Sequence, residues 1–109
     1  MRIRSTKPEF WRSGEIDPFD RPSWKAFGTA AAGSEFLYRL YGYAHELLYV
    51  GITWNPRVRW TEHSKTKPWW REVVHAEVWR CLYEEARAWE SRCIKEQAPK
   101  YNIHQAVKV

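Results

Sequence analysis

The sequence has no long apolar run, few cysteines and no internal repeat. No window of its 109 residues approaches the roughly 18 consecutive apolar residues that a membrane-spanning helix needs, and no apolar signal segment follows Met1. We therefore expect a cytoplasmic protein that does not enter membranes. Cys81 and Cys93 lack the paired spacing of a zinc site and the density of a disulfide scaffold, so we expect two buried free thiols.

Aromatic residues and positive charge are what the sequence has in quantity. Eight Trp, six Tyr and four Phe supply enough apolar area for one small core, and 109 residues fit a single domain. The formal net charge of +5 points to an anionic partner, and nucleic acid is the commonest such partner for a small basic protein. Net charge alone is a weak signal, so the positions of the basic residues must show whether the partner is a nucleic acid.

The composition changes near residue 33. Residues 1–33 contain three prolines and a run of small residues, and they show neither helical nor strand periodicity. We predict an irregular N-terminal arm over 1–33 and a compact domain over 34–109. The arm has too many aromatic residues for a disordered tail, so part of it should lie across the domain.

Two short runs of apolar and aromatic residues, 36–41 and 47–50, predict a β-hairpin. With a four-residue turn over 42–45, Tyr38 lies directly opposite Tyr49, and both phenols share one face of the sheet. The pattern alone favours a cross-strand aromatic pair that stabilises the sheet.

The rest of the chain predicts helices and one further strand. Asn55 can cap a helix and Pro56 suits its first turn, while Pro99 ends the last helix. The predicted elements are a helix over 56–64, a short helical stretch over 69–73, a strand over 74–82 and a helix over 84–98.

Three charged or titratable residues stand out on these helices. Arg59 and His63 are four residues apart and therefore neighbours on one face, a spacing that usually means only solvent exposure. Glu90 lies on or beside the apolar face of the last helix, where an unpaired charge is expensive. It needs a cation, either from the protein or from a bound metal, and its spacing alone favours a salt bridge to an arginine.

As an ordered set, residues 36–102 resemble the GIY-YIG nuclease family. Each motif alone is weak, but the order of six is a strong signal. Phe36 departs from the pattern, because the family usually has glycine there. The matching residues are Phe36-Leu37-Tyr38, Tyr49-Val50-Gly51, Arg59, His63, Glu90 and Pro99-Lys100-Tyr101-Asn102.

The resemblance implies an α/β (α+β) fold with a three-stranded antiparallel sheet flanked by helices, and hydrolysis of phosphodiester bonds with one divalent metal. It implies that Tyr38 and Tyr49 are active-site phenols, either of which can take the proton of water when a nearby cation favours the phenolate. The other implied roles are phosphate binding by Arg59, proton transfer by His63, metal binding by Glu90 and hydrogen bonding by Asn102. A single carboxylate suits Mg²⁺ or Mn²⁺, and a histidine pKa near neutrality suits a proton relay.

Basic residues beside the predicted site are expected to contact DNA phosphates without reading bases. They are Arg57, Lys65, Lys67 and Arg71. Trp69 and Trp70 can stack on an unpaired base, although at least one of them fits better in the core.

The sequence thus predicts a metal-dependent DNA endonuclease or nickase. The alternative is a DNA-binding or interaction module that keeps the nuclease fold and cleaves nothing. Residues 1–13 also resemble the opening of some bacteriophage replication proteins, which suggests a phage or prophage origin and the cytoplasm of a bacterial or phage-infected cell.

Overall fold

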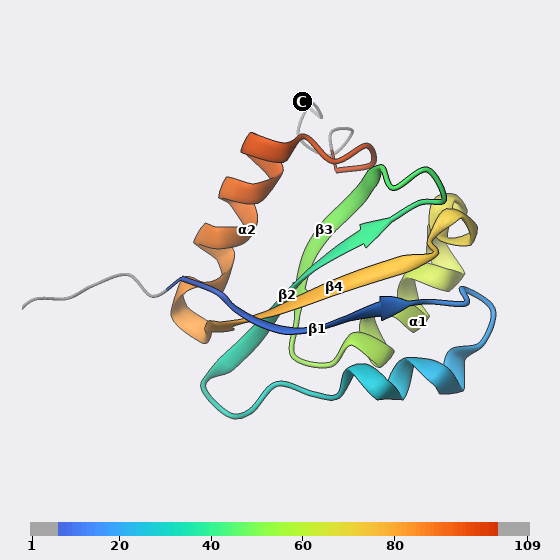
Figure 1. Cartoon of the computed structure of the whole chain (residues 1–109). Coiled ribbons are helices and arrows are strands. Elements are labelled where there is room, and N and C mark those ends of the chain that lie inside the picture. The colour runs from blue at the N-terminus through green and yellow to red at the C-terminus, as the bar shows by residue number, and fades with distance from the viewer. Residues whose placement is uncertain (1–6, 103–109) are drawn as a thin grey trace, which may run out of the picture.

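A computed structural model describes residues 7–102, which form a four-stranded antiparallel sheet with helices on both faces (Figure 1). The strand order is β1-β4-β2-β3, so the predicted antiparallel sheet is confirmed and its strand number is corrected from three to four. The strands are β1 (Glu9–Glu15), β2 (Ser34–Tyr41), β3 (Leu47–Thr53) and β4 (His75–Leu82). The α-helices are α1 (Pro56–Thr66) and α2 (Tyr83–Gln97), and the 3-10 helices are η1 (Arg21–Phe27) and η2 (Pro68–Glu72).

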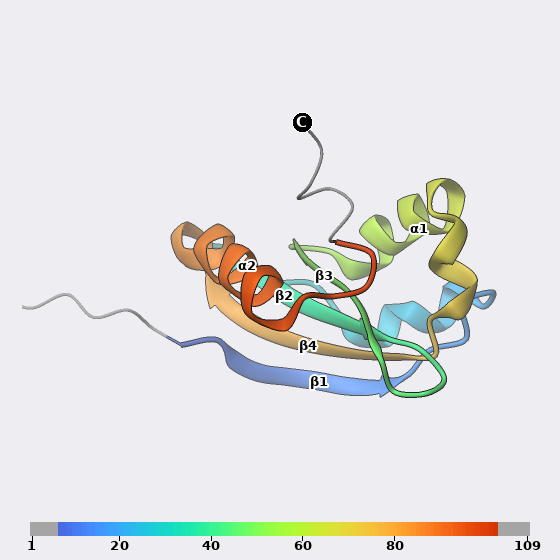
Figure 2. The same cartoon turned by 90° about the horizontal axis from the view of Figure 1, so that it is seen from above.

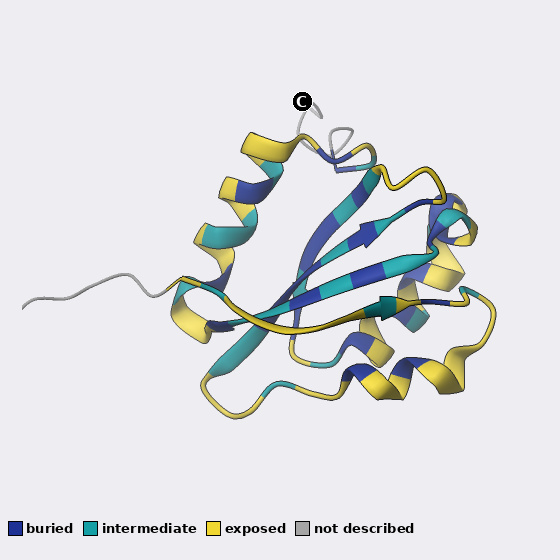
Figure 3. Ribbon diagram, viewed as in Figure 1, coloured by how far each residue is buried: buried dark blue, intermediate teal, exposed yellow. Residues whose placement is uncertain are grey.

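Helix α2 covers one face of the sheet, and α1 with the 3-10 helices covers the other (Figures 1 and 2). The core on the α1 side is built from aromatic rings, with Trp24 packed edge to face on Trp60 and Trp70. The core on the α2 side is smaller and contains both cysteines, which are buried and free as predicted. Buried positions concentrate on β2, β3 and β4, whereas β1 is mostly exposed (Figure 3).

The N-terminal segment contains regular structure that its sequence did not reveal. Residues Glu9–Glu15 form β1, which pairs with β4, and η1 adds two buried aromatic residues to the core. Phe10 contacts Trp79 at 5.4 Å between ring centroids, and Trp11 stacks against Phe36 at 5.6 Å. The predicted irregular arm is corrected over these residues. An edge strand with exposed side chains shows no apolar alternation, so sequence periodicity cannot detect it.

The β2–β3 hairpin confirms that Tyr38 and Tyr49 share a face and corrects their register. Tyr38 lies opposite Gly51, and Tyr49 lies opposite Leu40. Both tyrosine rings pack on the α1 side, with their centroids 6.2 Å apart. The two phenols are therefore diagonal neighbours, two residues out of the predicted alignment.

Two irregularities of one residue each cause this shift. The turn closes with the Gly42 N–H donating to the Glu46 carbonyl at 2.9 Å, and His45 has a left-handed φ of 65°. A bulge then places Leu48 as an extra residue on β3. Because side chains alternate with a period of two, the two shifts together restore the original face.

The helices follow their predicted signals closely. Asn55 caps α1 by accepting a bond from the Val58 N–H at 3.4 Å, and the helix runs two residues beyond the predicted end. Helix α2 begins one residue before its predicted start and ends at Gln97, one residue before its predicted end, with Ala98 as its C-cap just before Pro99. Within residues 7–102, no helix combines the length and apolarity that crossing a membrane requires.

The chain after α2 covers the outer edge of β3. The backbone N–H groups of Lys100 and Tyr101 donate to β3 carbonyls at 3.0 and 2.8 Å. The Asn102 side chain continues this pairing, because its Oδ1 accepts from the Val50 N–H at 2.7 Å and its Nδ2 donates to the Val50 carbonyl at 3.1 Å. Asn102 is 2% exposed, so its amide takes the place of a neighbouring strand.

Replacing Asn102 with alanine should destabilise the protein by about 2–4 kcal/mol, because two buried backbone groups of Val50 lose their partners. Urea unfolding measures this cost. The matched control is Asn55→Ala, which removes one helix cap and should cost about 1 kcal/mol. Equal losses for the two variants would contradict the bracing role of Asn102.

Candidate active site

Four residues singled out in the sequence line one pocket of about 200 Å³. The pocket lies beside the end of β3, the edge strand, which runs between α1 and α2 in Figures 1 and 2. The four residues come from four different elements, so the fold gathers side chains that are distant in sequence. They are Tyr38 from β2, Tyr49 from β3, Arg59 from α1 and Glu90 from α2, with Gly51, Ile52 and Arg87 completing the lining.

Tyr38 is the buried centre of this arrangement. Its side chain is 1% exposed, and its hydroxyl lies 2.8 Å from Nε2 of His63. Burial raises the pKa of Tyr38 well above its ordinary value, the nearby Tyr49 adds to this, and the charge of Arg59 opposes it. The phenol is therefore protonated at neutral pH.

Gly51 provides the space that the Tyr38 phenol fills. A Cβ built on Gly51 would lie 2.5 Å from the Tyr38 hydroxyl oxygen and 3.0 Å from the Tyr49 ring. Contacts this short mean that any side chain at this position would force the buried Tyr38 ring to move. Gly51, the last residue of the Tyr49-Val50-Gly51 motif, is therefore needed so that the Tyr38 ring can pack in its place.

His63 lies behind Tyr38 and is 4% exposed. Its ring meets the Tyr49 ring edge to face, with centroids 5.1 Å apart. Burial lowers the pKa of His63 to about 4, and the charges of Arg59 and Lys67 contribute to the shift. The predicted pKa near neutrality is therefore wrong, because the imidazole is buried among cations and stays neutral at pH 7.

Glu90 reaches the pocket as a half-buried carboxylate without the salt bridge expected for it. Among residues 7–102 it forms no ion pair or hydrogen bond. Burial raises the pKa of Glu90, while the charges of Arg87 and Arg59 oppose this. The Arg59 guanidinium instead contacts Glu62 at 3.4 Å, with its side chain 47% exposed. Within residues 7–102, the carboxylate therefore has cations in the same pocket but no direct ion pair with any of them.

These residues fit a divalent cation that is held by one or two carboxylates and completed by water and substrate oxygens. Glu90 supplies a hard oxygen ligand with an uncompensated charge. Behind it, Glu35 has a buried carboxylate oxygen without a hydrogen-bond partner, and its charge reaches Glu90. Within the described part of the chain, no three His, Cys, Asp or Glu side chains form a metal-binding group. The donor set thus suits Mg²⁺ or Mn²⁺ better than zinc.

The other predicted site residues lie outside the pocket. Asn102 stands behind β3 and fixes Val50, the residue between Tyr49 and Gly51. The four predicted DNA contacts divide between two places. Lys65, Lys67 and Arg71 line a groove at the end of α1, and Arg57 lies on a separate hollow of the α1 surface.

Trp69 and Trp70 both belong to the core, which confirms the prediction that at least one of them fits there and corrects the alternative that they stack on a base. They are 9% and 3% exposed. Trp69 stacks between Tyr49 and Tyr101, at centroid distances of 5.0 and 5.2 Å. The Trp70 indole donates to the Pro18 carbonyl at 2.9 Å.

Arg87 is the pocket residue that the sequence analysis missed. It precedes Glu90 by three residues on α2, so both side chains lie on one helix face. The three-residue spacing between Arg87 and Glu90 could have indicated this from the sequence. One turn of the helix places the Arg87 cation beside Glu90, the proposed metal ligand.

Comparisons of the chain with protein-family models, with curated proteins and with solved structures find no match. The resemblance to the GIY-YIG family therefore stays a prediction that rests on the motif residues.

Replacing Gly51 with alanine should cost about 1–3 kcal/mol of stability, because the added methyl group must displace the buried Tyr38 ring. Thermal and urea unfolding measure this loss. Gly14→Ala on β1 is the matched control: its Cβ would meet only the Phe27 ring at an ordinary 3.9 Å, so little change is expected. A Gly51 variant as stable as the control would refute the close packing described above.

The buried His63 should make the protein sensitive to mild acid. Its pKa is about 4 in the folded state and near 6.5 when unfolded, so below pH 6.5 the unfolded chain binds the proton first. Stability should fall by about 2–3 kcal/mol between pH 7 and pH 4.5 on account of His63 alone. Urea unfolding at both pH values should show this loss reduced in His63→Gln and retained in His75→Gln. The same pH dependence in all three proteins would exclude His63 as its source.

Proposed function

We propose that the protein is a metal-dependent DNA endonuclease or nickase of the GIY-YIG type, which hydrolyses phosphodiester bonds. The observation that supports this most is the shared pocket of Tyr38, Tyr49, Arg59 and Glu90. These residue types supply a proton acceptor, a phosphate ligand and a metal ligand, which phosphodiester hydrolysis requires together.

Arg59 is the phosphate ligand in this proposal. Its side chain is half exposed, and within residues 7–102 its one ion pair is a surface contact with Glu62, so substrate can displace that contact at little cost. A guanidinium binds two phosphate oxygens at once, which a lysine cannot do. Arg87 lines the opposite side of the pocket entrance as a second cation on α2.

Glu90 holds the divalent cation in this proposal. When bound, the cation supplies positive charge beside the reacting phosphate and makes the attacking water easier to deprotonate. Glu90 is half-buried and forms no salt bridge within residues 7–102, which supports this role, because a purely structural carboxylate at this position would be expected to carry one.

The pair of Tyr38 and His63 accepts the proton of the attacking water. The phenol is protonated and the imidazole neutral. In this proposal the proton of the imidazole is on Nδ1, so the phenol donates to Nε2 across the 2.8 Å contact and keeps an oxygen lone pair free. Water then passes a proton to the Tyr38 oxygen while Tyr38 passes its own proton to Nε2. The water oxygen forms the new bond to phosphorus as the bond to the leaving oxygen breaks. The contact with His63 favours Tyr38 over Tyr49 in this role.

Substrate itself makes His63 a better proton acceptor. The positive charge of Arg59 is one of the causes that lower the pKa of His63. A phosphate bound to Arg59 offsets that charge, so the pKa of His63 rises when the site is filled. The free protein thus keeps a neutral imidazole ready, and the proton acceptor strengthens only with substrate in place.

Plasmid nicking tests the proposal. With Mg²⁺ the protein should convert supercoiled plasmid to nicked or linear forms, and chelator should prevent this. Glu90→Gln and Tyr38→Phe should each lose at least about 100-fold in rate, because each removes a group that acts on the reacting atoms. The matched control is Glu96→Gln on the same helix, which breaks only an exposed pair with Arg92 and should retain activity.

Two results would contradict the proposal. Cleavage that survives in Glu90→Gln would mean a contaminating nuclease or a wrong metal ligand. A folded protein that shifts DNA in a gel at low salt, yet cuts none of it with Mg²⁺ or Mn²⁺, would support the alternative of a binding module.

A further inference from the structure

A basic groove at the end of α1 is the second feature of the molecule that fits a nucleic acid. It has a volume of about 550 Å³ and lies between the turn after β1 and the end of α1 with η2. Figures 1 and 2 both place these segments together at one end of the molecule. Its charged lining residues are all cations, namely Arg21, Lys65, Lys67 and Arg71. Among residues 7–102, none of these cations forms a salt bridge.

Phe19 stands at this groove with its side chain 79% exposed. Three hydrogen bonds fix the backbone of the turn that carries this ring. The Phe19 N–H donates to the Asp17 carboxylate at 2.9 Å, and the carbonyls of Asp17 and Pro18 accept bonds from the indoles of Trp24 and Trp70 at 3.0 and 2.9 Å. An exposed ring on a fixed backbone can stack on another flat group at a lower entropic cost than one on a mobile segment.

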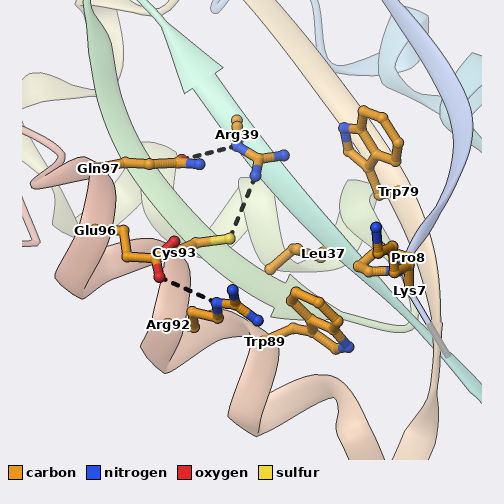
Figure 4. A pocket seen from close by; sticks show the side chains of 10 residues that line it. All are labelled: Lys7, Pro8, Leu37, Arg39, Trp79, Trp89, Arg92, Cys93, Glu96 and Gln97. Atoms are coloured by element: carbon orange, nitrogen blue, oxygen red, sulfur yellow. Dashed lines mark hydrogen bonds and ion pairs between the residues drawn. The ribbon is translucent and has the colours of Figure 1, made fainter. Parts of the chain in front are cut away.

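The hollow on the α2 face makes a useful contrast (Figure 4). Its volume is about 360 Å³, and its two arginines already have partners. Arg39 bonds to Gln97 at 3.0 Å and to Cys93 at 3.3 Å, and Arg92 bonds to Glu96 at 3.1 Å. Of these two hollows in the described part of the chain, the groove beside Phe19 is the one that combines several cations outside salt bridges with a ring that is 79% exposed.

The groove adjoins the candidate active site through the end of α1. The Lys67 N–H donates to the His63 carbonyl at 2.8 Å, so a groove cation directly follows the turn that carries the imidazole. Lys67 also follows Arg59 by eight residues, about 12 Å along a helix axis. That distance corresponds to roughly three nucleotides of a stacked strand. One strand can therefore contact both places.

We propose that this groove binds an unpaired strand of the nucleic acid, with Phe19 stacked on one base and the four cations on the phosphates beside it. The inference rests on the proposed function for the identity of the polymer as DNA, and it adds that the preferred substrate has a single-stranded segment next to the cleaved bond. Stacking and phosphate contact together bind single strands without reading their sequence.

A continuous duplex does not fit this groove as well. Its bases are stacked inside the helix, so Phe19 would meet only sugar and phosphate. An aromatic ring gains from nucleic acid when a base is free to lie on it, and each such contact contributes measurably to binding. The exposed Phe19 ring therefore favours a single strand over a continuous duplex as the substrate of this groove.

Fluorescence anisotropy in EDTA tests this without cleavage. The probes are a labelled 12-nucleotide oligothymidine, an abasic strand of equal length and a blunt 12-base-pair duplex. Oligothymidine should bind most tightly. Phe19→Ala should weaken its binding about tenfold and leave binding of the abasic strand unchanged, because that strand has no base to stack.

The contribution of the basic residues to binding is tested with a separate variant and measured by the salt dependence of the affinity. The double variant Lys65→Ala with Arg71→Ala should weaken binding of oligothymidine and of the abasic strand alike. It should reduce the slope of log affinity against log salt by roughly 0.7 for each lost contact. Tyr43→Ala, which removes a 93% exposed ring on the hairpin turn, and Lys95→Ala on α2 are the matched controls. Neither should change binding.

Three outcomes would overturn the inference: binding of oligothymidine unchanged in Phe19→Ala, a duplex bound as tightly as the single strand, or no salt-dependent binding of any probe. Thermal unfolding of each variant ensures that lost binding is not lost folding. These outcomes are separate from those of the plasmid test. If the protein cleaves plasmid but Phe19→Ala binds oligothymidine normally, the proposed role of the groove is wrong and the nuclease proposal stands. If the groove binds oligothymidine as expected but the protein cleaves no plasmid, the nuclease proposal is wrong and the role of the groove stands.

Discussion

The candidate site depends on the space that Gly51 leaves for the Tyr38 phenol. The hydroxyl lies where a side chain on β3 would otherwise stand, and from there it reaches Nε2 of His63 at 2.8 Å. Any displacement of the ring would break this bond and leave the imidazole of His63, which is 4% exposed, without its partner, which is costly for a buried polar group. The hairpin register sets Tyr38 opposite Gly51, and this placement lets the phenol on the sheet contact His63 on α1.

The position of β3 at the edge of the sheet explains how residues from both faces meet in one pocket. Helices α1 and α2 lie on opposite faces, and an interior strand would keep their side chains apart. At the edge, Arg59 and Glu90 reach the same pocket beside Gly51. An open edge also exposes backbone groups that can pair with other chains. The Asn102 amide and the two residues before it cover part of that edge, so the site stays open where Gly51 lies and is closed beside Val50.

The sequence predicted the features that depend on neighbouring residues, such as the helix ends. It did not predict the features that depend on tertiary packing, such as the hairpin register and the pKa of His63. The caps at Asn55 and Pro99 located both α-helices to within two residues, because capping depends only on neighbouring atoms. The hairpin face was right and its register was wrong by two, since a left-handed His45 and a bulge at Leu48 carry no sequence signal that alternation can detect. Strand β1 escaped notice because its side chains are mostly exposed. The pKa of His63 depends chiefly on burial, which exists only in the folded chain, and to a lesser extent on Arg59 and Lys67, each four residues away.

Under the proposed function, the charges in the pocket favour the binding of phosphate and a divalent cation together. The pocket is lined by two arginines and one glutamate. Phosphate bound to Arg59 adds negative charge near Glu90, a half-buried carboxylate whose pKa burial already raises. A divalent cation relieves that repulsion, and the phosphate in turn supplies oxygen ligands that a single carboxylate lacks. Each ligand therefore strengthens the other by the same factor, as linkage requires. A site with weak affinity for either ligand alone can in this way bind both, and the charge balance then favours reaction only when substrate is present.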